Sequence, residues 1–88
     1  MKRRPAPRVI NVAVEARFEL AGAIVPVRYA VAGQEHLITS VGRSWRVAGE
    51  GWHFLVMDEQ GRVRELLLRL PALRWQLLPG PEDDLSYC

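Results

Sequence analysis

Residues 10–20 read INVAVEARFEL, and apolar side chains recur there at every second position. The apolar set is Ile10, Val12, Val14, Ala16, Phe18 and Leu20. Successive side chains of a β-strand point to opposite faces of the sheet, so this spacing predicts a strand with one buried and one solvated face. The stretch therefore favours a fold built from strands.

Similar segments follow along the chain, separated by residues that favour turns. Residues 23–25 lie between Gly22 and Pro26, and the predicted strands that follow cover residues 27–32, 35–41, 52–57 and 74–78. Residues 44–47 continue the strand of residues 35–41 beyond a bend at Gly42. The connections contain Gly22, Gly33, Gly49, Gly51 and Gly61. Glycine adopts positive φ at little cost, so these positions predict tight reversals between neighbouring strands.

Residues 63–70, VRELLLRL, allow two interpretations because their leucines are nearly continuous. Periodicity alone is compatible with a short helix as well as with a strand. We favour a strand, since residues 58–61 (DEQG) have the composition of a hairpin connection. Pro71 also ends the segment after about eight residues, fewer than a typical helix contains.

The predicted fold is all-β, a small antiparallel meander of five or six strands that closes into an SH3-like barrel. Closure is expected because an open sheet of this size leaves unpaired edges. A chain of 88 residues provides for one domain, which we place at residues 9–78. Residues 1–8 are predicted to be a flexible basic arm, and residues 79–88 a flexible acidic tail.

Charge is distributed unevenly along a chain whose formal net charge is only +2. The bases of residues 1–8 are Lys2, Arg3, Arg4 and Arg8, and the acids of residues 79–88 are Glu82, Asp83 and Asp84. A basic arm can neutralise the phosphates of nucleic acid. Short charged termini also serve simply to keep a protein soluble, and this alternative stays open.

The chain contains one cysteine, Cys88, so no internal disulfide can form. It has no apolar run of about 18 residues and no signal-type segment, which predicts a cytoplasmic protein without a membrane partner. The nitrogen and sulfur ligands, His36, His53 and Cys88, are too few and too scattered for a zinc site. Phosphate-binding and dinucleotide motifs are also missing, so we expect a non-enzymatic protein without metal or cofactor.

Arginine interleaved with tryptophan is the remaining signal of function. Arg43, Trp45 and Arg46 fall within four residues, and Arg74 precedes Trp75. Guanidinium groups neutralise phosphates and aromatic rings stack on bases, so the pattern indicates single-stranded DNA as a partner. The candidate residues for nucleic-acid binding are Lys2, Arg3, Arg4, Arg8, Arg43, Trp45, Arg46, Arg62, Arg74 and Trp75.

Two other roles for the aromatic residues stay open. A small barrel needs large side chains in its core, and we assign Tyr29, Trp52 and Phe54 to packing. Tryptophan and arginine are also frequent at protein interfaces. Trp45, Trp75 and the leucine-rich strand would then form a protein-interaction or self-association surface, as in a homodimer.

Several short motifs resemble a known family. They are residues 28–31 (RYAV), 45–47 (WRV), 63–66 (VREL) and 74–77 (RWQL). On these motifs, residues 27–78 resemble a small uncharacterised bacterial β domain associated with translesion-polymerase-like DNA repair proteins. The resemblance implies a small β domain and a DNA-processing protein as a partner. Arg64 stands where the family often has an aromatic residue, which implies different packing of that strand.

Overall fold

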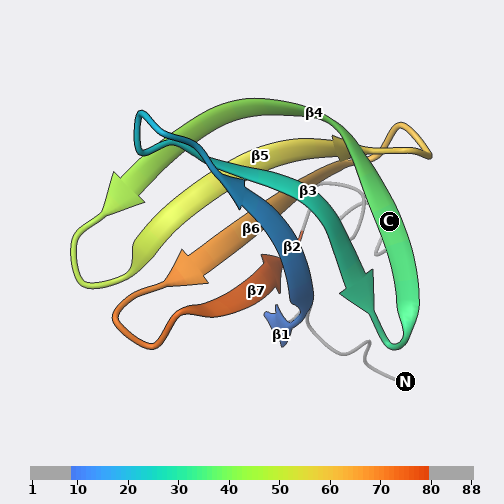
Figure 1. The fold of residues 1–88 in the computed structure, drawn as a ribbon. Helices are drawn as coiled ribbons and strands as arrows, with labels where there is room; N and C mark the ends of the chain where they lie inside the picture. Colours follow the sequence, from blue (N-terminus) through green and yellow to red (C-terminus); the bar gives the residue numbers. More distant parts are fainter. Residues whose placement is uncertain (1–8, 80–88) are drawn as a thin grey trace, which may run out of the picture.

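The computed structural model describes residues 9–79, which form one seven-stranded antiparallel sheet curled into an open half-barrel (Figure 1). The strands are β1 (Ile10–Asn11), β2 (Ala13–Phe18), β3 (Ile24–Val31), β4 (Gln34–Val47), β5 (Gly51–Asp58), β6 (Val63–Arg69) and β7 (Arg74–Leu78). Their order in the sheet is β1-β7-β6-β5-β4-β3-β2, and residues 9–79 contain no helix. The predicted all-β antiparallel meander is confirmed.

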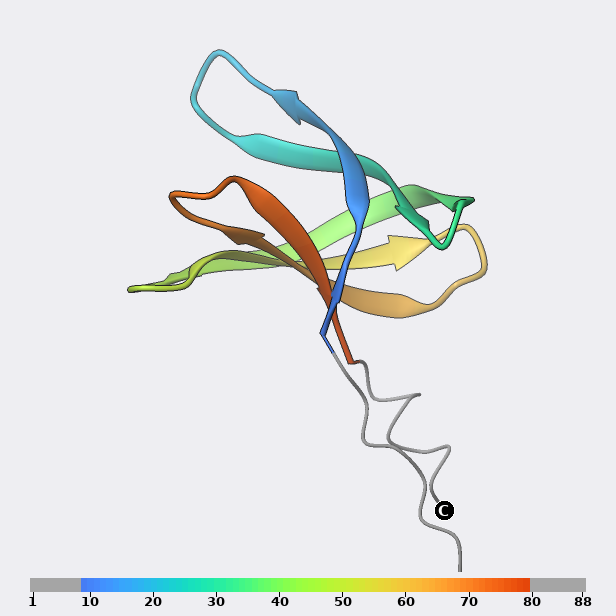
Figure 2. The same ribbon diagram turned by 90° about the horizontal axis from the view of Figure 1, so that it is seen from below.

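The sheet has seven strands, rather than five or six, because residues 10–20 divide at Val12. Strand β1 pairs with β7, whereas β2 pairs with β3 at the opposite end of the strand order. The N–H of Val12 donates to the carbonyl oxygen of Trp75 at 3.1 Å. Residues 10–18 therefore form the strands at both edges of the sheet, β1 and β2, as the blue ribbon of Figure 2 shows.

The leucine-rich segment is strand β6, which lies between β5 and β7, and the alternative of a short helix is wrong. Leu66, Leu67 and Leu68 are all buried although successive residues point to opposite faces. A strand that is buried on both faces has a continuous apolar run in place of alternation. This is why the periodicity of the segment was ambiguous.

One face of the sheet, which we call the inner face, carries the hydrophobic core. Its buried members are Tyr29, Phe54, Val56, Leu66, Leu68 and Leu77, with Trp52 and Trp75 packed against them. The packing roles predicted for Tyr29, Trp52 and Phe54 are confirmed. Phe18 and Leu20 were expected to be buried and are exposed, Phe18 to 71%. The expectation is wrong there because the β2–β3 hairpin diverges from the rest of the sheet (Figure 2).

Strand β4 is long and takes part in two ladders. It pairs with β3 as far as the pair Arg28↔Leu37, and from Ile38 onward it pairs with β5. A register shift between Val41 and Ser44 accommodates the bend predicted at Gly42.

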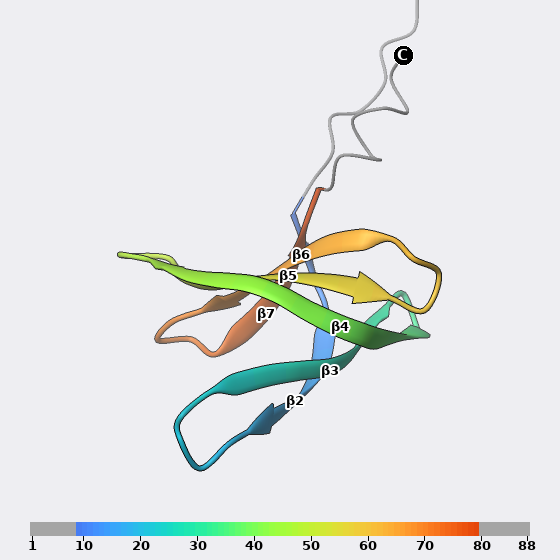
Figure 3. The same cartoon turned by 90° about the horizontal axis from the view of Figure 1, so that it is seen from above.

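The divergence of the β2–β3 hairpin has a local cause in Pro26. This proline lies in β3 next to a register shift against β2, and it has no N–H to donate to a ladder. Strand β3 pairs with β4 only after it, from Arg28 to Val31. Figure 3 shows the two strands separating toward the β2–β3 turn.

Candidate functional site

The face opposite the core, which we call the outer face, carries a row of directly opposed residues. Trp45 pairs with His53, His53 with Leu67, and Leu67 with Gln76. The rings of Trp45 and His53 stack, with centroids 5.2 Å apart and planes at 6°. The guanidinium carbon of Arg43 lies 5.7 Å from the centroid of the Trp45 ring. Trp45 is thus an ordered, half-buried ring on the outer face.

His53 is buried, and carboxylates contact both of its ring nitrogens. Nδ1 lies 2.7 Å from Oε2 of Glu65, and Nε2 lies 2.5 Å from Oε1 of Glu50. Each carboxylate thus lies within hydrogen-bond distance of one ring nitrogen. Glu50 and Glu65 are therefore engaged with His53 rather than with the arginines of the outer face.

Two arginines lie opposite each other at one end of the outer face. Arg69 of β6 pairs with Arg74 of β7, two positions along the strands from the Trp45 row. Like charges in directly opposed positions destabilise a sheet. Within residues 9–79, Arg43, Arg69 and Arg74 form no ion pair. The outer face therefore presents three guanidinium groups whose charge the described chain leaves uncompensated.

The predicted nucleic-acid residues are divided between the two faces. Those on the outer face are Arg43, Trp45 and Arg74. Arg46 lies opposite Trp52 and so points to the inner side of β4. Trp75 packs on Phe54, with ring centroids 5.6 Å apart and planes at 38°. Trp75 therefore belongs to the packing around the core.

The other predicted residues lie elsewhere. Arg62 is bonded to Asp58 at the β5–β6 turn. Lys2, Arg3, Arg4 and Arg8 lie outside the described residues. Sequence reasoning missed Arg69, whose position becomes apparent only from the register Arg69↔Arg74 across the turn at Pro71. The hairpin composition around Pro71 was the available signal.

A second polar cluster surrounds the buried Asp58. Its carboxylate accepts hydrogen bonds from the Tyr29 hydroxyl at 3.0 Å, the Gln60 N–H at 2.9 Å, and both the N–H and Nε of Arg62 at 3.0 Å. Burial raises the pKa of Asp58, but donors that include the Arg62 N–H and the Tyr29 hydroxyl outweigh burial, and the pKa lies below its ordinary value. Burial and the hydrogen bond to Asp58 raise the pKa of Tyr29 to about 12.

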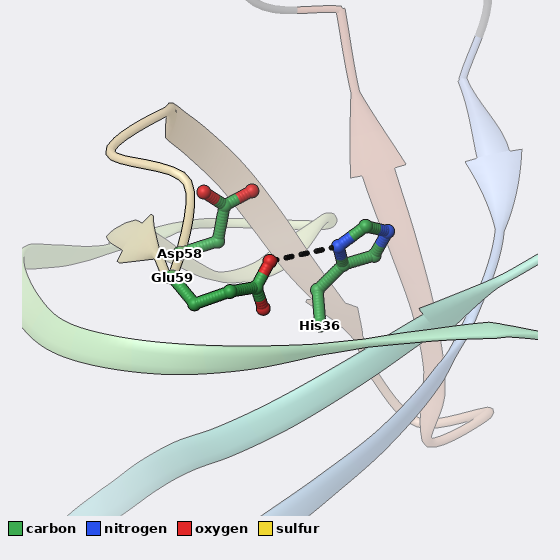
Figure 4. A group of neighbouring side chains, drawn as sticks. All are labelled: His36, Asp58 and Glu59. Carbon is green, nitrogen blue, oxygen red and sulfur yellow. Dashed lines mark hydrogen bonds and ion pairs between the residues drawn. The ribbon is translucent and has the colours of Figure 1, made fainter.

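His36, Asp58 and Glu59 bring ligand-type atoms within 4.8 Å of one another (Figure 4). Glu59 Oε2 lies 3.2 Å from His36 Nδ1, and its other carboxylate oxygen accepts from the Leu37 N–H. The hydrogen bond with His36 lowers the pKa of Glu59. In Figure 4 the Asp58 carboxylate turns away from this pair, toward the donors named above. We interpret the group as a structural connection between β4 and the β5–β6 turn, because a cation on either oxygen of Asp58 would compete with the two hydrogen bonds that this oxygen accepts.

Comparison with protein-family models, curated proteins and solved structures finds no match to this chain. Within residues 9–79, no helix has the length and apolarity that crossing a bilayer requires. A functional assignment therefore depends on the chemistry of the surface.

Proposed function

We propose that this protein is a non-enzymatic module that binds single-stranded nucleic acid on its outer face. One observation carries the proposal: Arg43, Arg69 and Arg74 share that face with the half-buried ring of Trp45, and no carboxylate of the described chain neutralises them. The neighbouring acids, Glu50 and Glu65, are engaged with His53.

Each part of this surface suits a component of a nucleotide. Guanidinium groups neutralise phosphates and release condensed counterions. The Trp45 ring, already ordered by its contact with His53, offers a surface on which stacking is worth about 1–3 kcal/mol per base. Neighbouring strands are about 4.8 Å apart, so arginines placed from β4 to β7 extend over roughly 15 Å across the sheet.

We extend the proposal to a role beside DNA-processing proteins, which the resemblance of residues 27–78 implies, and we place this role in the cytoplasm. We also interpret the open half-barrel as a form of SH3-like barrel. What supports this interpretation is the segment of residues 10–18, which pairs with β7 at one end and with β3 at the other, as the closing strand of such a barrel does. Binding of this kind needs neither a metal nor a cofactor.

Fluorescence anisotropy with a labelled 20-nucleotide oligothymidine, measured between 50 and 200 mM salt, tests the proposal. Binding should weaken as salt rises, and Arg43→Ala, Arg69→Ala and Arg74→Ala should each reduce the slope of log K against log salt by about 0.7. Arg17→Ala is the matched control, because it removes an exposed arginine of β2 that is paired with Glu19. It should leave the slope unchanged.

Trp45→Leu separates stacking from charge. Leucine keeps an apolar side chain at this position but has no aromatic surface, so affinity should fall about tenfold while the salt slope stays the same. Circular dichroism of each variant verifies the fold. Absence of binding at micromolar protein in 50 mM salt, or equal slopes for Arg17→Ala and the outer-face variants, would contradict the proposal.

A further inference from the structure

We infer that the unpaired edge of β4 and the cavity beside it form a docking site for an extended acidic peptide segment of a partner protein. We call this site the β4-edge groove. It consists of the edge of residues 39–46 and a cavity lined by Gly22, Ala23, Ile24, Ser44, Trp52 and Phe54. Arg69 and Arg74, on which the proposed nucleic-acid surface depends, are not part of it.

The backbone of β4 beyond Ile38 is paired on one side only. Residues 38–47 pair with β5, and the last pair with β3 is Arg28↔Leu37. Within the described chain, no backbone hydrogen bond reaches the opposite side of residues 39–46. Pro26 lies in the part of β3 that would have to supply one. An edge with free N–H and C=O groups is a template for an added strand.

The cavity between the β2–β3 hairpin and the main sheet has a volume of about 210 Å³. Trp52 and Phe54 form its floor on β5, and Ile24 lines it on the hairpin. Phe18 lies opposite Ile24 in the ladder and is 71% exposed, so a further apolar side chain is accessible beside the cavity. A cavity of about 150 Å³ in another protein takes up benzene. The β4-edge groove therefore has room for one leucine or phenylalanine side chain.

The positive charges beside the groove favour binding of an acidic peptide. Side chains of an added strand alternate between the two faces, so a residue opposite Ser44 points to the inner face and into the cavity. Residues two positions from this anchor lie beside Arg46, and residues three positions away lie on the outer face, diagonally across from Arg43. Neither arginine forms an ion pair within residues 9–79. The matching segment has an apolar anchor with carboxylates two and three positions away on either side.

The same charges disfavour a second copy of this chain in the groove. An antiparallel pairing of two β4 edges centred on Ser44 or Trp45 would gather both copies of Arg43 and Arg46 close to the two-fold axis. Like charges opposed across a ladder are destabilising, and natural edge strands use charge to prevent self-pairing. An acidic strand incurs no such penalty.

The test uses a capped heptapeptide of sequence EEVFVEE, titrated into ¹⁵N-labelled full-length protein. Saturable shifts should appear at the amides of residues 39–47 and 22–24. Two control peptides separate the components of binding. EEVSVEE lacks the apolar anchor, and EEVFVEE methylated on the alternate backbone nitrogens that would face β4 cannot donate hydrogen bonds to that strand. Each should bind at least tenfold more weakly.

Substitutions in the protein test the same site independently of changes in the peptide. Ser44→Leu places a larger side chain in the cavity and should weaken binding of EEVFVEE at least tenfold. Gln34→Leu is the matched control, because Gln34 is an exposed polar residue of the same strand that pairs with β3 and lies outside the groove, and it should have no effect. Arg46→Ala should weaken binding, whereas Arg17→Ala should not.

Several results would overturn the inference. Equal binding of the N-methylated peptide excludes strand addition, and unchanged binding to Ser44→Leu excludes the cavity. A dimer in sedimentation that Ser44→Leu abolishes would identify a second copy as the occupant, and weaker oligothymidine binding by Ser44→Leu would identify nucleic acid. Arg69→Ala and Arg74→Ala should weaken oligothymidine binding alone, so the two proposals can fail separately.

Discussion

Replacing Asp58 by asparagine should destabilise the fold strongly, although it exchanges only one carboxylate oxygen for an amide NH2 group. The Asp58 side chain is 1% exposed, and its carboxylate accepts four hydrogen bonds of 2.9–3.0 Å. Asparagine keeps one oxygen for the Gln60 and Arg62 N–H groups. Its amide nitrogen then faces Nε of Arg62, and two donors cannot bond to each other.

The expected loss in free energy of unfolding follows from the hydrogen bonds that Asp58→Asn weakens or removes. Bonds to a charged group are worth about 1.5–3 kcal/mol and neutral bonds about 0.5–1.5, so each retained bond loses about 1 kcal/mol. Loss of the bond to Nε of Arg62 adds to this, and relief of the cost of burying a charge offsets part of it. We expect Asp58→Asn to lower the free energy of unfolding by about 3 kcal/mol, consistent with removal of one partner of a buried ion pair.

Thermal and urea unfolding measure the effect. For a domain of this size, 3 kcal/mol corresponds to a fall in Tm of about 12–24 °C. Tyr29→Phe removes one of the four bonds and should cost about half as much, with a smaller additional effect in the Asp58→Asn background. A loss of less than about 0.5 kcal/mol in Asp58→Asn would show that the charged hydrogen bonds of Asp58 do not stabilise the fold, since that is the range of ordinary surface substitutions.

The pH dependence of stability gives a second readout of the same carboxylate. Because the folded-state pKa of Asp58 is lowered, its contribution is present above its ordinary pKa near 4 and is lost as pH falls through the folded-state value. Asp58→Asn removes this titrating group. Its free energy of unfolding should therefore depend less on pH below about 4 than that of the parent protein.

Two further predictions concern Gly51 and Tyr29. Gly51 has φ of +143°, and a Cβ there would lie 2.0 Å from the carbonyl oxygen of Leu68, so Gly51→Ala should cost about 3 kcal/mol or more in urea unfolding. Gly49→Ala, where φ is +79° and no atom lies within 4 Å, should cost only about 1 kcal/mol, and equal effects would contradict the steric argument. The raised pKa of Tyr29 means that its contribution to stability is complete below pH 10 and is lost as pH rises toward about 12. In a Tyr87→Phe background, phenolate absorbance should titrate near 12 in the native protein and near 10 in urea, and one common midpoint would count against the buried Tyr29–Asp58 hydrogen bond.

The strand pattern was predictable where burial alternates along the chain, as in residues 12–16, whose even-numbered residues are half-buried and whose odd-numbered residues are exposed. It was ambiguous in β6, because burial of Leu66 and Leu67 on opposite faces removes the alternation on which the prediction depends. The alternating pattern wrongly predicted that Phe18 is buried. An apolar residue in an alternating strand is buried only if another element covers it, and the diverging hairpin leaves Phe18 exposed.

The candidate site was predictable in composition but not in arrangement. Arg43 and Trp45 belong to one strand and are separated by two positions, so their contact follows from the geometry of a strand. Arg69 joins them only through the register of β6 with β5 and β7. Arg46 and Trp75 were indistinguishable from them in sequence and point to the inner face.

The strands and the reversals between them follow from the amino-acid sequence, because alternation of side chains and the need for positive φ act within a few residues. The partners of those strands, the cavity beside β4 and the donors that surround Asp58 depend on the fold of the whole chain. Tyr29 and Asp58 are 29 residues apart, and their hydrogen bond depends on the packing of the whole inner face. Contacts over such separations are set jointly by all the strands, so no local pattern specifies them.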